Sequence, residues 1–266
     1  MLRQRVITAL LLGLPLLAIL LFAPAPWIVL VLALVIVLGT WEWGGLFARH
    51  RAVRVFYVVL FMALMLVTYL MPAQGNVQRL MLVAIAWWVL AACWIVFVPQ
   101  LGTRWLIALA GALVLFPLWM ALKTLLLHHQ HAGELILCLL LIVTATDIGA
   151  YFTGRALGKH KLAPRVSPGK TWEGVAGGLL SSMIAAALAA RWLDVQAGSF
   201  VVLGLLTAIF SIVGDLTESL FKRHAGLKDS SNILPGHGGV LDRIDSITAA
   251  APVFVYGLMQ LHVVTL

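Results

Sequence analysis

Residues 80–98 read LMLVAIAWWVLAACWIVFV and include no charged side chain. A helix that crosses a bilayer needs about 20 mostly apolar residues, so this stretch predicts a transmembrane helix. Further stretches qualify in the same way: 6–23, 27–47, 54–71, 105–126, 135–153, 173–190, 200–220 and 247–265. We therefore predict an all-α, polytopic integral membrane protein with about nine transmembrane helices.

The composition of the whole chain supports the membrane class. Of its 266 residues, 62% are apolar and 11% are charged, and the mean hydropathy is +1.05. A soluble domain has about 25% charged residues. The net charge of +8 falls in short gaps between apolar runs, so the expected partners are membrane lipids and phosphate substrates, with no nucleic acid. Both cysteines lie within apolar runs and indicate neither a disulfide nor a metal site.

The N-terminus resembles a secretory signal, because residues 1–5 are basic and residues 6–22 are apolar. Pro26 lies where cleavage would have to occur, and we therefore predict an uncleaved first transmembrane helix. With the N-terminus in the cytoplasm, 15 Lys and Arg residues fall on the cytoplasmic side and three on the opposite side. This asymmetry follows the positive-inside rule and predicts that orientation.

Two polar stretches, residues 154–172 and 221–246, both fall on the cytoplasmic side of this arrangement. They contain most of the Gly, Lys, Asp and His residues outside the predicted helices. A multi-span protein with its polar chemistry on one face is expected to act on a water-soluble cytoplasmic substrate. We therefore divide the chain into N-terminal transmembrane helices, residues 1–130, and a C-terminal catalytic region, residues 131–266, that carries both loops.

Acids at membrane depth are candidates for function, because a charge at the bilayer centre costs about 2.5–3.5 kcal/mol on insertion scales. Asp147, Asp215 and Glu218 lie within predicted spans, toward their cytoplasmic ends. Asp215 and Glu218 are three residues apart and share one helix face, which continues into Lys222. For Glu42, near a predicted helix end, a functional role and an interfacial ion pair with a nearby Lys or Arg are equally open.

The densest polar stretch, residues 219–245, reads SLFKRHAGLKDSSNILPGHGGVLDRID. Its cations are of the types that bind phosphate, and the glycine turn at 235–239 brings backbone N–H groups within reach of phosphate oxygens. Asp242 and Asp245 face the same way on a helix start, and such acids suit Mg²⁺ bound together with substrate phosphates. This combination predicts phosphoryl or nucleotidyl transfer. His237 is either a turn residue or a substrate contact.

The second polar stretch carries DIGAY at 147–151 and SPGKTWEG at 167–174. Gly-Lys-Thr at 169–171 resembles the end of a P-loop, but position 164 is Pro and no strand is predicted before it, so we exclude that fold. Ser, Lys and Thr beside a predicted helix N-terminus suit an anion. The alternative is a positively charged loop that only anchors topology. Gly174 and Gly178 form a G-x-x-x-G pair that indicates close helix packing.

Residues 219–245 resemble the signature of the phosphatidate cytidylyltransferase family. The pattern is S-x-hydrophobic-K-R-x4-K-D followed by P-x-H-G-G-hydrophobic-x-D-R-hydrophobic-D, and this chain matches it without departure. Residues 147–151 and 167–174 resemble upstream elements of the same family. The resemblance covers roughly residues 145–250, whereas the first five predicted helices are similar mainly in hydropathy.

The resemblance implies transfer of the cytidylyl group of CTP to phosphatidic acid, giving CDP-diacylglycerol and pyrophosphate in phospholipid biosynthesis. It implies Mg²⁺ dependence with K⁺ as a second ion, a homodimer, and a multi-pass protein of the cell inner membrane. As metal ligands it implies Asp215, Asp242 and Asp245. As phosphate-binding or other catalytic groups it implies Lys222, Arg223, Lys228, Arg243 and His237. As substrate-binding residues it implies Ser167, Lys170, Thr171, Asp147, Tyr151, Gly238 and Gly239.

Two other functions remain as alternatives. A polytopic lipid or solute transporter would carry charged groups near mid-membrane in several helices and polar loops on both faces. A CDP-alcohol phosphotransferase would carry the signature D-G-x2-A-R-x8-G-x3-D-x3-D, which is absent from this sequence. The run His128-His129-Gln130-His131 lies on the predicted non-cytoplasmic side, where a headgroup contact is favoured over a metal site.

Overall fold

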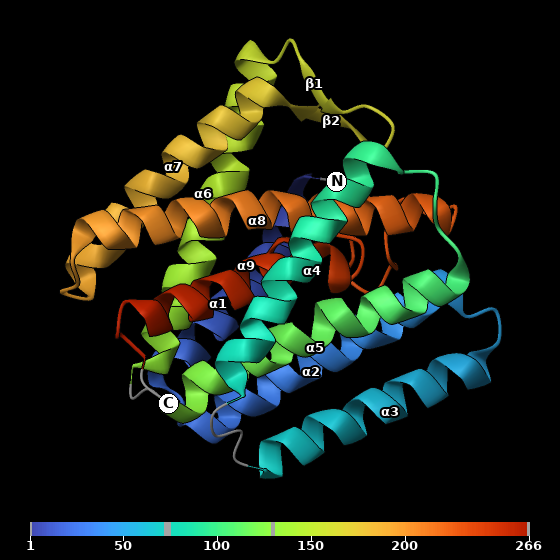
Figure 1. Ribbon diagram of the computed structural model, residues 1–266, viewed down its shortest axis with the longest axis horizontal. Helices are drawn as coiled ribbons and strands as arrows, with labels where there is room; N and C mark the ends of the chain where they lie inside the picture. The colour runs from blue at the N-terminus through green and yellow to red at the C-terminus, as the bar shows by residue number, and fades with distance from the viewer. Residues whose placement is uncertain (1, 72–75, 129–130, 265–266) are drawn as a thin grey trace.

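The computed structural model of the protein describes residues 2–71, 76–128 and 131–264. These residues form nine α-helices and one short antiparallel hairpin (Figure 1). The elements are α1 (Leu2–Phe22), α2 (Ala25–Phe47), α3 (Arg51–Leu70), α4 (Val77–Phe97), α5 (Arg104–His128), α6 (Ala132–Leu157), β1 (Lys161–Ala163), β2 (Ser167–Thr171), α7 (Trp172–Trp192), α8 (Ala197–His224) and α9 (Leu241–Gln260).

The helices make this an all-α polytopic membrane protein, as predicted. Seven of the described helices, α2 to α8, are long and apolar enough to cross a bilayer. In α1 the apolar helix whose side chains the structure describes is shorter, Gly13–Phe22. α9 begins with three charged residues in its first five. The number of nine spans therefore stays a prediction.

α6 and α7 run side by side and carry the hairpin at their end, α8 crosses the middle of the molecule, and α3 lies at its outer edge (Figure 1).

An aromatic cluster lies where α2, α4 and α8 meet. The ring of Phe221 in α8 packs edge-on against Trp43 of α2 and Trp94 of α4, with centroids 5.5 and 5.6 Å away. This cluster joins the N-terminal helices to the end of α8.

Small residues let α6 and α7 approach closely. A Cβ atom on Gly174 would lie 2.9 Å from the carbonyl oxygen of Ala150, and one on Gly178 would lie 2.8 Å from that of Thr146. The prediction that this glycine pair serves helix packing is therefore confirmed.

Three local features differ from the sequence prediction. No strand was predicted before the Gly-Lys-Thr run, but the short strand β1 precedes it, so that expectation was wrong. The run itself lies in strand β2, where a loop was predicted. α8 continues to His224, which places Lys222 and Arg223 on the helix and not in a loop. α9 begins at Leu241, earlier than expected, so Asp242 and Asp245 lie on its first turns.

The histidine run at the start of α6 is described only in part. His129 and Gln130, and the side chain of His128, lie outside the described residues. His131 precedes α6, and its Nδ1 lies 3.0 Å from Oε1 of Glu134. The headgroup contact stays a prediction.

Gly178→Ala is expected to destabilise the protein, because the added methyl group would meet the backbone of α6. Overpacking of this kind costs about 1–3 kcal/mol, which lowers the midpoint of thermal unfolding in detergent. Gly13→Ala is the matched control, since no atom lies within 4 Å of its added methyl group. Equal midpoints for the two variants would contradict the close packing of α6 on α7.

Candidate active site

A polar pocket of about 500 Å³ opens between α6, β2, α7 and α8. The polar side chains that line it come from three separate stretches between residues 147 and 215, which the fold brings together. They are Asp147, Tyr151 and Arg155 of α6, Ser167, Lys170 and Thr171 of β2, and Asp215 of α8. All five side chains that the sequence predicted to bind substrate outside residues 219–245 line this one pocket.

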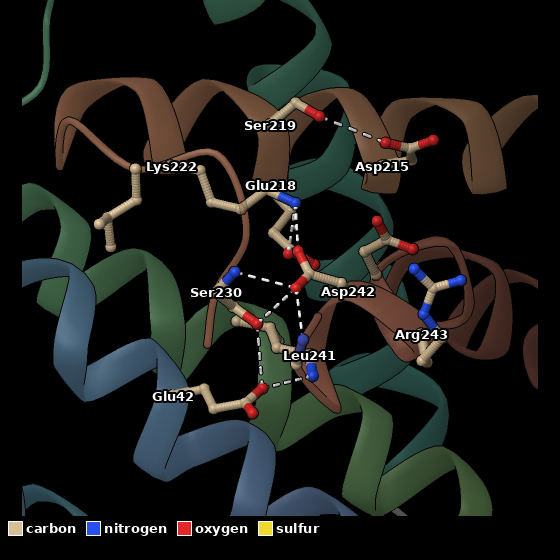
Figure 2. Close-up of polar contacts among 12 residues, drawn as sticks. Glu42, Asp215, Glu218, Ser219, Lys222, Ser230, Leu241, Asp242 and Arg243 are labelled. Carbon is tan, nitrogen blue, oxygen red and sulfur yellow. Dashed lines mark hydrogen bonds and ion pairs between the residues drawn. The ribbon is translucent and has the colours of Figure 1, made fainter. Parts of the chain in front are cut away.

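An ion pair crosses the polar pocket from β2 to α8. The ammonium of Lys170 lies 2.7 Å from Oδ2 of Asp215, and both side chains are about a quarter to a third exposed. The hydroxyl of Ser219 lies 3.3 Å from Oδ1 of Asp215 (Figure 2). Asp147 adds a second negative charge, which repels Asp215 and attracts Lys170. The pocket therefore presents the ammonium of Lys170 together with two acids, Asp147 and Asp215.

Two pocket residues have roles that the sequence did not predict. The buried hydroxyl of Thr171 accepts a hydrogen bond from the backbone N–H of Gly174 at 3.1 Å and caps α7. Arg155 lies one turn after Tyr151 on α6, and its Nη1 donates to the Tyr151 hydroxyl at 3.1 Å. The spacing of four residues from Tyr151 could have pointed to Arg155, but the helix was predicted to end at residue 153, whereas α6 continues to Leu157.

A second polar group lies where α8 meets the start of α9 (Figure 2). The ammonium of Lys222 lies 2.6 Å from Oδ1 of Asp242 and 3.0 Å from Oε1 of Glu218. Lys222 is 7% exposed and Glu218 is 3% exposed. Oε2 of Glu218 has no hydrogen-bond partner among the described residues. The buried ammonium of Lys222 thus binds two carboxylates, one from α8 and one from α9.

Asp242 also holds the segment before α9, residues 225–240, which we call the signature loop. Its Oδ2 accepts from the backbone N–H and the hydroxyl of Ser230, both at 2.9 Å, and from the N–H of Gly239 at 2.8 Å. With Lys222 on Oδ1, both oxygens of Asp242 are engaged. Gly238 is needed here, because its φ of +82° lies in the left-handed region and an added Cβ would sit 2.8 Å from Asp242.

Asp245 connects the two polar groups. α8 and α9 approach closely at Gly214, where a Cβ would lie 2.6 Å from the carbonyl oxygen of Asp245. The charge of Asp245 is repelled by Asp215 and attracted by Lys170 and Lys222. The charged side chains of the polar pocket and Lys222 therefore all act on Asp245.

The remaining predicted residues lie on or beside the signature loop. Nη1 of Arg223 donates to the carbonyl of Leu227 at 3.1 Å, and Nη2 of Arg243 donates to that of His237 at 2.9 Å. Nδ1 of His237 is buried and has no partner among the described residues. Lys228 is exposed. Exposed cations thus lie on the loop and beside it, at Lys228, Arg223 and Arg243.

The sequence left two interpretations of Glu42, a functional role and an interfacial ion pair. Glu42 is 0% exposed and forms no ion pair within the described part of the chain. The interpretation as an interfacial ion pair was therefore wrong. Its carboxylate accepts hydrogen bonds from the signature loop and the start of α9. No local sequence pattern indicated this contact.

The acids of the site have the chemistry that Mg²⁺ requires. Among the described residues no three His, Cys, Asp or Glu side chains gather closely enough to hold an ion by themselves. Mg²⁺ usually binds through one or two carboxylates and completes its shell with water and substrate phosphates. Asp215 and Asp245, which repel each other, are hard oxygen donors of this kind, so the residues present fit the ion.

The fold and the site together define a class of protein. It is a polytopic membrane protein in which carboxylates and lysines gather where apolar helices end, as in enzymes that handle phosphates. The chain matches a family model described as "Cytidylyltransferase family" over residues 3–261, and it belongs to that family.

Individual relatives agree with the family match. The chain is 46% identical to "Phosphatidate cytidylyltransferase" of Pseudomonas aeruginosa over 262 residues, which cover 96% of each chain. It is 40% identical to the protein of the same name from Haemophilus influenzae, over 96% of this chain and 98% of the relative. A relative of that name from Staphylococcus aureus is 48% identical over 127 residues, 47% of this chain and 49% of the relative. The family resemblance of residues 219–245 is therefore confirmed.

Lys222→Met is expected to lower the thermal unfolding midpoint strongly, because it leaves Glu218 as a buried charge without a partner. Removing one member of a buried ion pair costs about 3–5 kcal/mol. Adding Glu218→Gln should recover part of this loss, since the uncompensated charge is removed. The midpoints of the single and double variants in detergent test the pairing. A double variant no more stable than Lys222→Met would contradict it.

Proposed function

We propose that this protein transfers the cytidylyl group of CTP to phosphatidic acid, giving CDP-diacylglycerol and pyrophosphate for phospholipid biosynthesis. The observation that carries the proposal is similarity over nearly the full chain to proteins named phosphatidate cytidylyltransferase. A transporter is not favoured, because the polar side chains gather at one end of α6, α7, α8 and α9.

The proposed reaction is an in-line displacement at phosphorus. A phosphate oxygen of phosphatidic acid attacks the α-phosphorus of CTP, a new P–O bond forms, and the bond to the bridging oxygen breaks as pyrophosphate leaves. The attacking oxygen is already anionic, so no side-chain base has to remove a proton. The protein therefore contributes mainly by positioning two polyanions and neutralising their charge.

The polar pocket is proposed to bind one of the two phosphate substrates. Lys170 supplies the cation, and Ser167 supplies a hydroxyl donor beside it. Asp147 and Tyr151 shape the wall on α6. Because Lys170 is paired with Asp215 in the structure, an entering phosphate has to compete with that carboxylate for the ammonium. Thr171 contributes by fixing the start of α7.

The signature loop and its flanks are proposed to bind the other substrate. Arg223, Lys228 and Arg243 offer exposed cations, and Lys222 lies beneath them. Gly238 and Gly239 are proposed to shape this side of the substrate site, because only glycine fits where the loop packs on Asp242 and Glu42. His237 is proposed as a substrate contact, because its buried Nδ1 has no partner among the described residues.

Mg²⁺ is proposed as the cofactor, with K⁺ as a second ion. Within the described part of the chain, Asp245 is the most available of the proposed ligands, because only its Oδ1 accepts a hydrogen bond, from the N–H of Ser246. Asp215 is a proposed ligand that already contacts Lys170 through Oδ2 and the Ser219 hydroxyl through Oδ1. Asp242 is the third proposed ligand and shares its Oδ1 with Lys222. A divalent ion supplies charge neutralisation on the triphosphate.

The membrane arrangement is proposed to have nine spans, with the N-terminus and the active site in the cytoplasm. The distribution of 15 and three Lys and Arg residues supports this orientation. We further propose the cell inner membrane as the location, a homodimer as the assembly, and 1–130 and 131–266 as the variable and catalytic regions.

Asp215→Asn is expected to reduce incorporation of labelled CTP into lipid by at least about 100-fold, because it removes a proposed Mg²⁺ ligand and the partner of Lys170. The assay uses purified protein in detergent with phosphatidic acid and Mg²⁺. Asp194→Asn is the matched control: Asp194 lies between α7 and α8 and has a φ of 52° that Asn also tolerates. Turnover of Asp215→Asn equal to that of the control would exclude the metal role.

Lys170→Ala is expected to raise the KM for one phosphate substrate by about tenfold or more, with a smaller change in kcat, because the pocket loses the ammonium on β2 and keeps only the guanidinium of Arg155. Varying CTP at saturating phosphatidic acid, and then the reverse, identifies the substrate. Lys161→Ala, on the exposed strand β1, serves as control. If neither KM moves, Lys170 only anchors topology.

A further inference from the structure

Glu42 of α2 holds the loop that carries the proposed chemistry, although it lies 188 to 199 positions away from its partners in the sequence. Its Oε1 accepts from the Ser231 hydroxyl at 2.6 Å and the Val240 N–H at 3.0 Å. Its Oε2 accepts from the Ser230 hydroxyl at 3.1 Å and the Leu241 N–H at 2.6 Å (Figure 2). Each oxygen thus binds one hydroxyl and one backbone N–H.

These backbone N–H groups belong to the start of α9, where a helix leaves its first N–H groups without partners inside the helix. Val240, at the N-cap position, provides no side-chain cap. Glu42 supplies the missing acceptors from another helix, and its negative charge is favourable beside the positive end of α9. Arg54 attracts Glu42 through space but donates its Nε–H to the carbonyl of Trp41. The acid is therefore committed to α9 and the loop.

The glycine before α9 is explained by the same contact. A Cβ atom on Gly239 would lie 2.0 Å from the hydroxyl oxygen of Ser230 and 2.6 Å from Oε2 of Glu42. No side chain fits there while Glu42 stays in place. Gly239 also donates its N–H to Asp242, so the loop is held on one side by Glu42 and on the other by Asp242.

Ser230 links the two acids. Its hydroxyl oxygen lies 3.1 Å from Oε2 of Glu42 and 2.9 Å from Oδ2 of Asp242. A hydroxyl has one proton, so it donates to one carboxylate at a time. Asp242 in turn binds Lys222, which gives a continuous chain of contacts from α2 through the signature loop to α8. The orientation of Asp242 and Lys222 therefore depends on where Glu42 holds the loop.

We propose that Glu42 is a positioning residue for cytidylyl transfer: it fixes the signature loop and the first turn of α9, and through them Asp242 and Lys222. The inference rests on the proposed function. Glu42 acts through these residues, because it is fully buried and does not line the polar pocket.

The Glu42→Gln variant distinguishes an acceptor role from simple space filling. The amide has the same shape but replaces one acceptor oxygen by an NH₂ donor. Whichever way the amide is turned, its NH₂ group faces the N–H of Val240 or of Leu241. A hydroxyl can rotate to accept from the NH₂ group, whereas a backbone N–H cannot. Glu42→Asp keeps two charged acceptor oxygens on a shorter side chain and should recover part of the function.

The first measurement is steady-state turnover of the full-length protein in detergent with CTP, Mg²⁺ and phosphatidic acid. We expect Glu42→Gln to lower kcat by about tenfold or more, with the KM for phosphatidic acid changed less than about threefold, and Glu42→Asp to fall between Glu42→Gln and wild type. Glu134→Gln is the matched control, because this acid lies at the start of α6 beside His131, away from the signature loop.

The second measurement is amide hydrogen exchange, which requires no turnover. We expect faster exchange in residues 228–244 of Glu42→Gln, with α6 and α7 unchanged. Ser231→Ala keeps the charge of Glu42 but removes one of its donors and also the acceptor of the Ile233 N–H. It should give a smaller increase, measured at Val240 and Leu241 and not at Ile233, and it substitutes for Glu42→Gln if that variant does not fold. Unchanged loop exchange with wild-type kcat overturns the proposal, and so does faster exchange throughout the protein. An inactive wild type instead refutes the proposed function, while loop-limited exchange still supports the role of Glu42.

Discussion

A carboxylate at the end of an apolar helix is stable only where cations, hydroxyls or N–H groups take the place of water, and this constraint organises the structure. Glu42 is surrounded by two hydroxyls and two N–H groups, Glu218 and Asp242 share Lys222, and Asp215 pairs with Lys170. Asp245 accepts a hydrogen bond from the N–H of Ser246 and lies near the charges of Asp215, Lys170 and Lys222.

The apolar scaffold determines how closely these groups meet. Helices without long polar side chains at their contacts can approach until backbone atoms touch, and Gly214 allows this between α8 and α9, as Gly178 does between α6 and α7. The contact at Gly214 places Asp215 near Asp245. The contact at Gly178 places the pocket wall of α6 opposite β2. Close packing within the apolar part thus sets the spacing of the polar groups at its end.

The sequence predicted whatever depends on composition or on neighbours a few residues apart. Apolar runs identified the helices, and the stretch 219–245 identified the family and most of the polar residues that the structure brings together. Hydropathy did not indicate the hairpin, because β1 and β2 are short and polar, and it ended α8 too early, because Lys222 is charged although it is buried within the helix bundle. Local sequence patterns also did not predict which groups bind Asp242.

The role of Glu42 could not be predicted from local patterns either, because its partners are far away in the sequence. Its contacts join the N-terminal half of the chain to the C-terminal half. A single acid near the end of an apolar helix has no local partner, and its four donors appear only when the chain returns nearly 200 residues later. Residues 1–130 lie outside the signature stretch, yet one of their side chains caps α9 and occupies the space that Gly239 leaves. The glycine of the signature and the acid of the N-terminal half are therefore two sides of one contact. A substitution at either position changes the packing requirement at the other, so the N-terminal helices contribute to the geometry of the site as well as to its anchorage in the membrane.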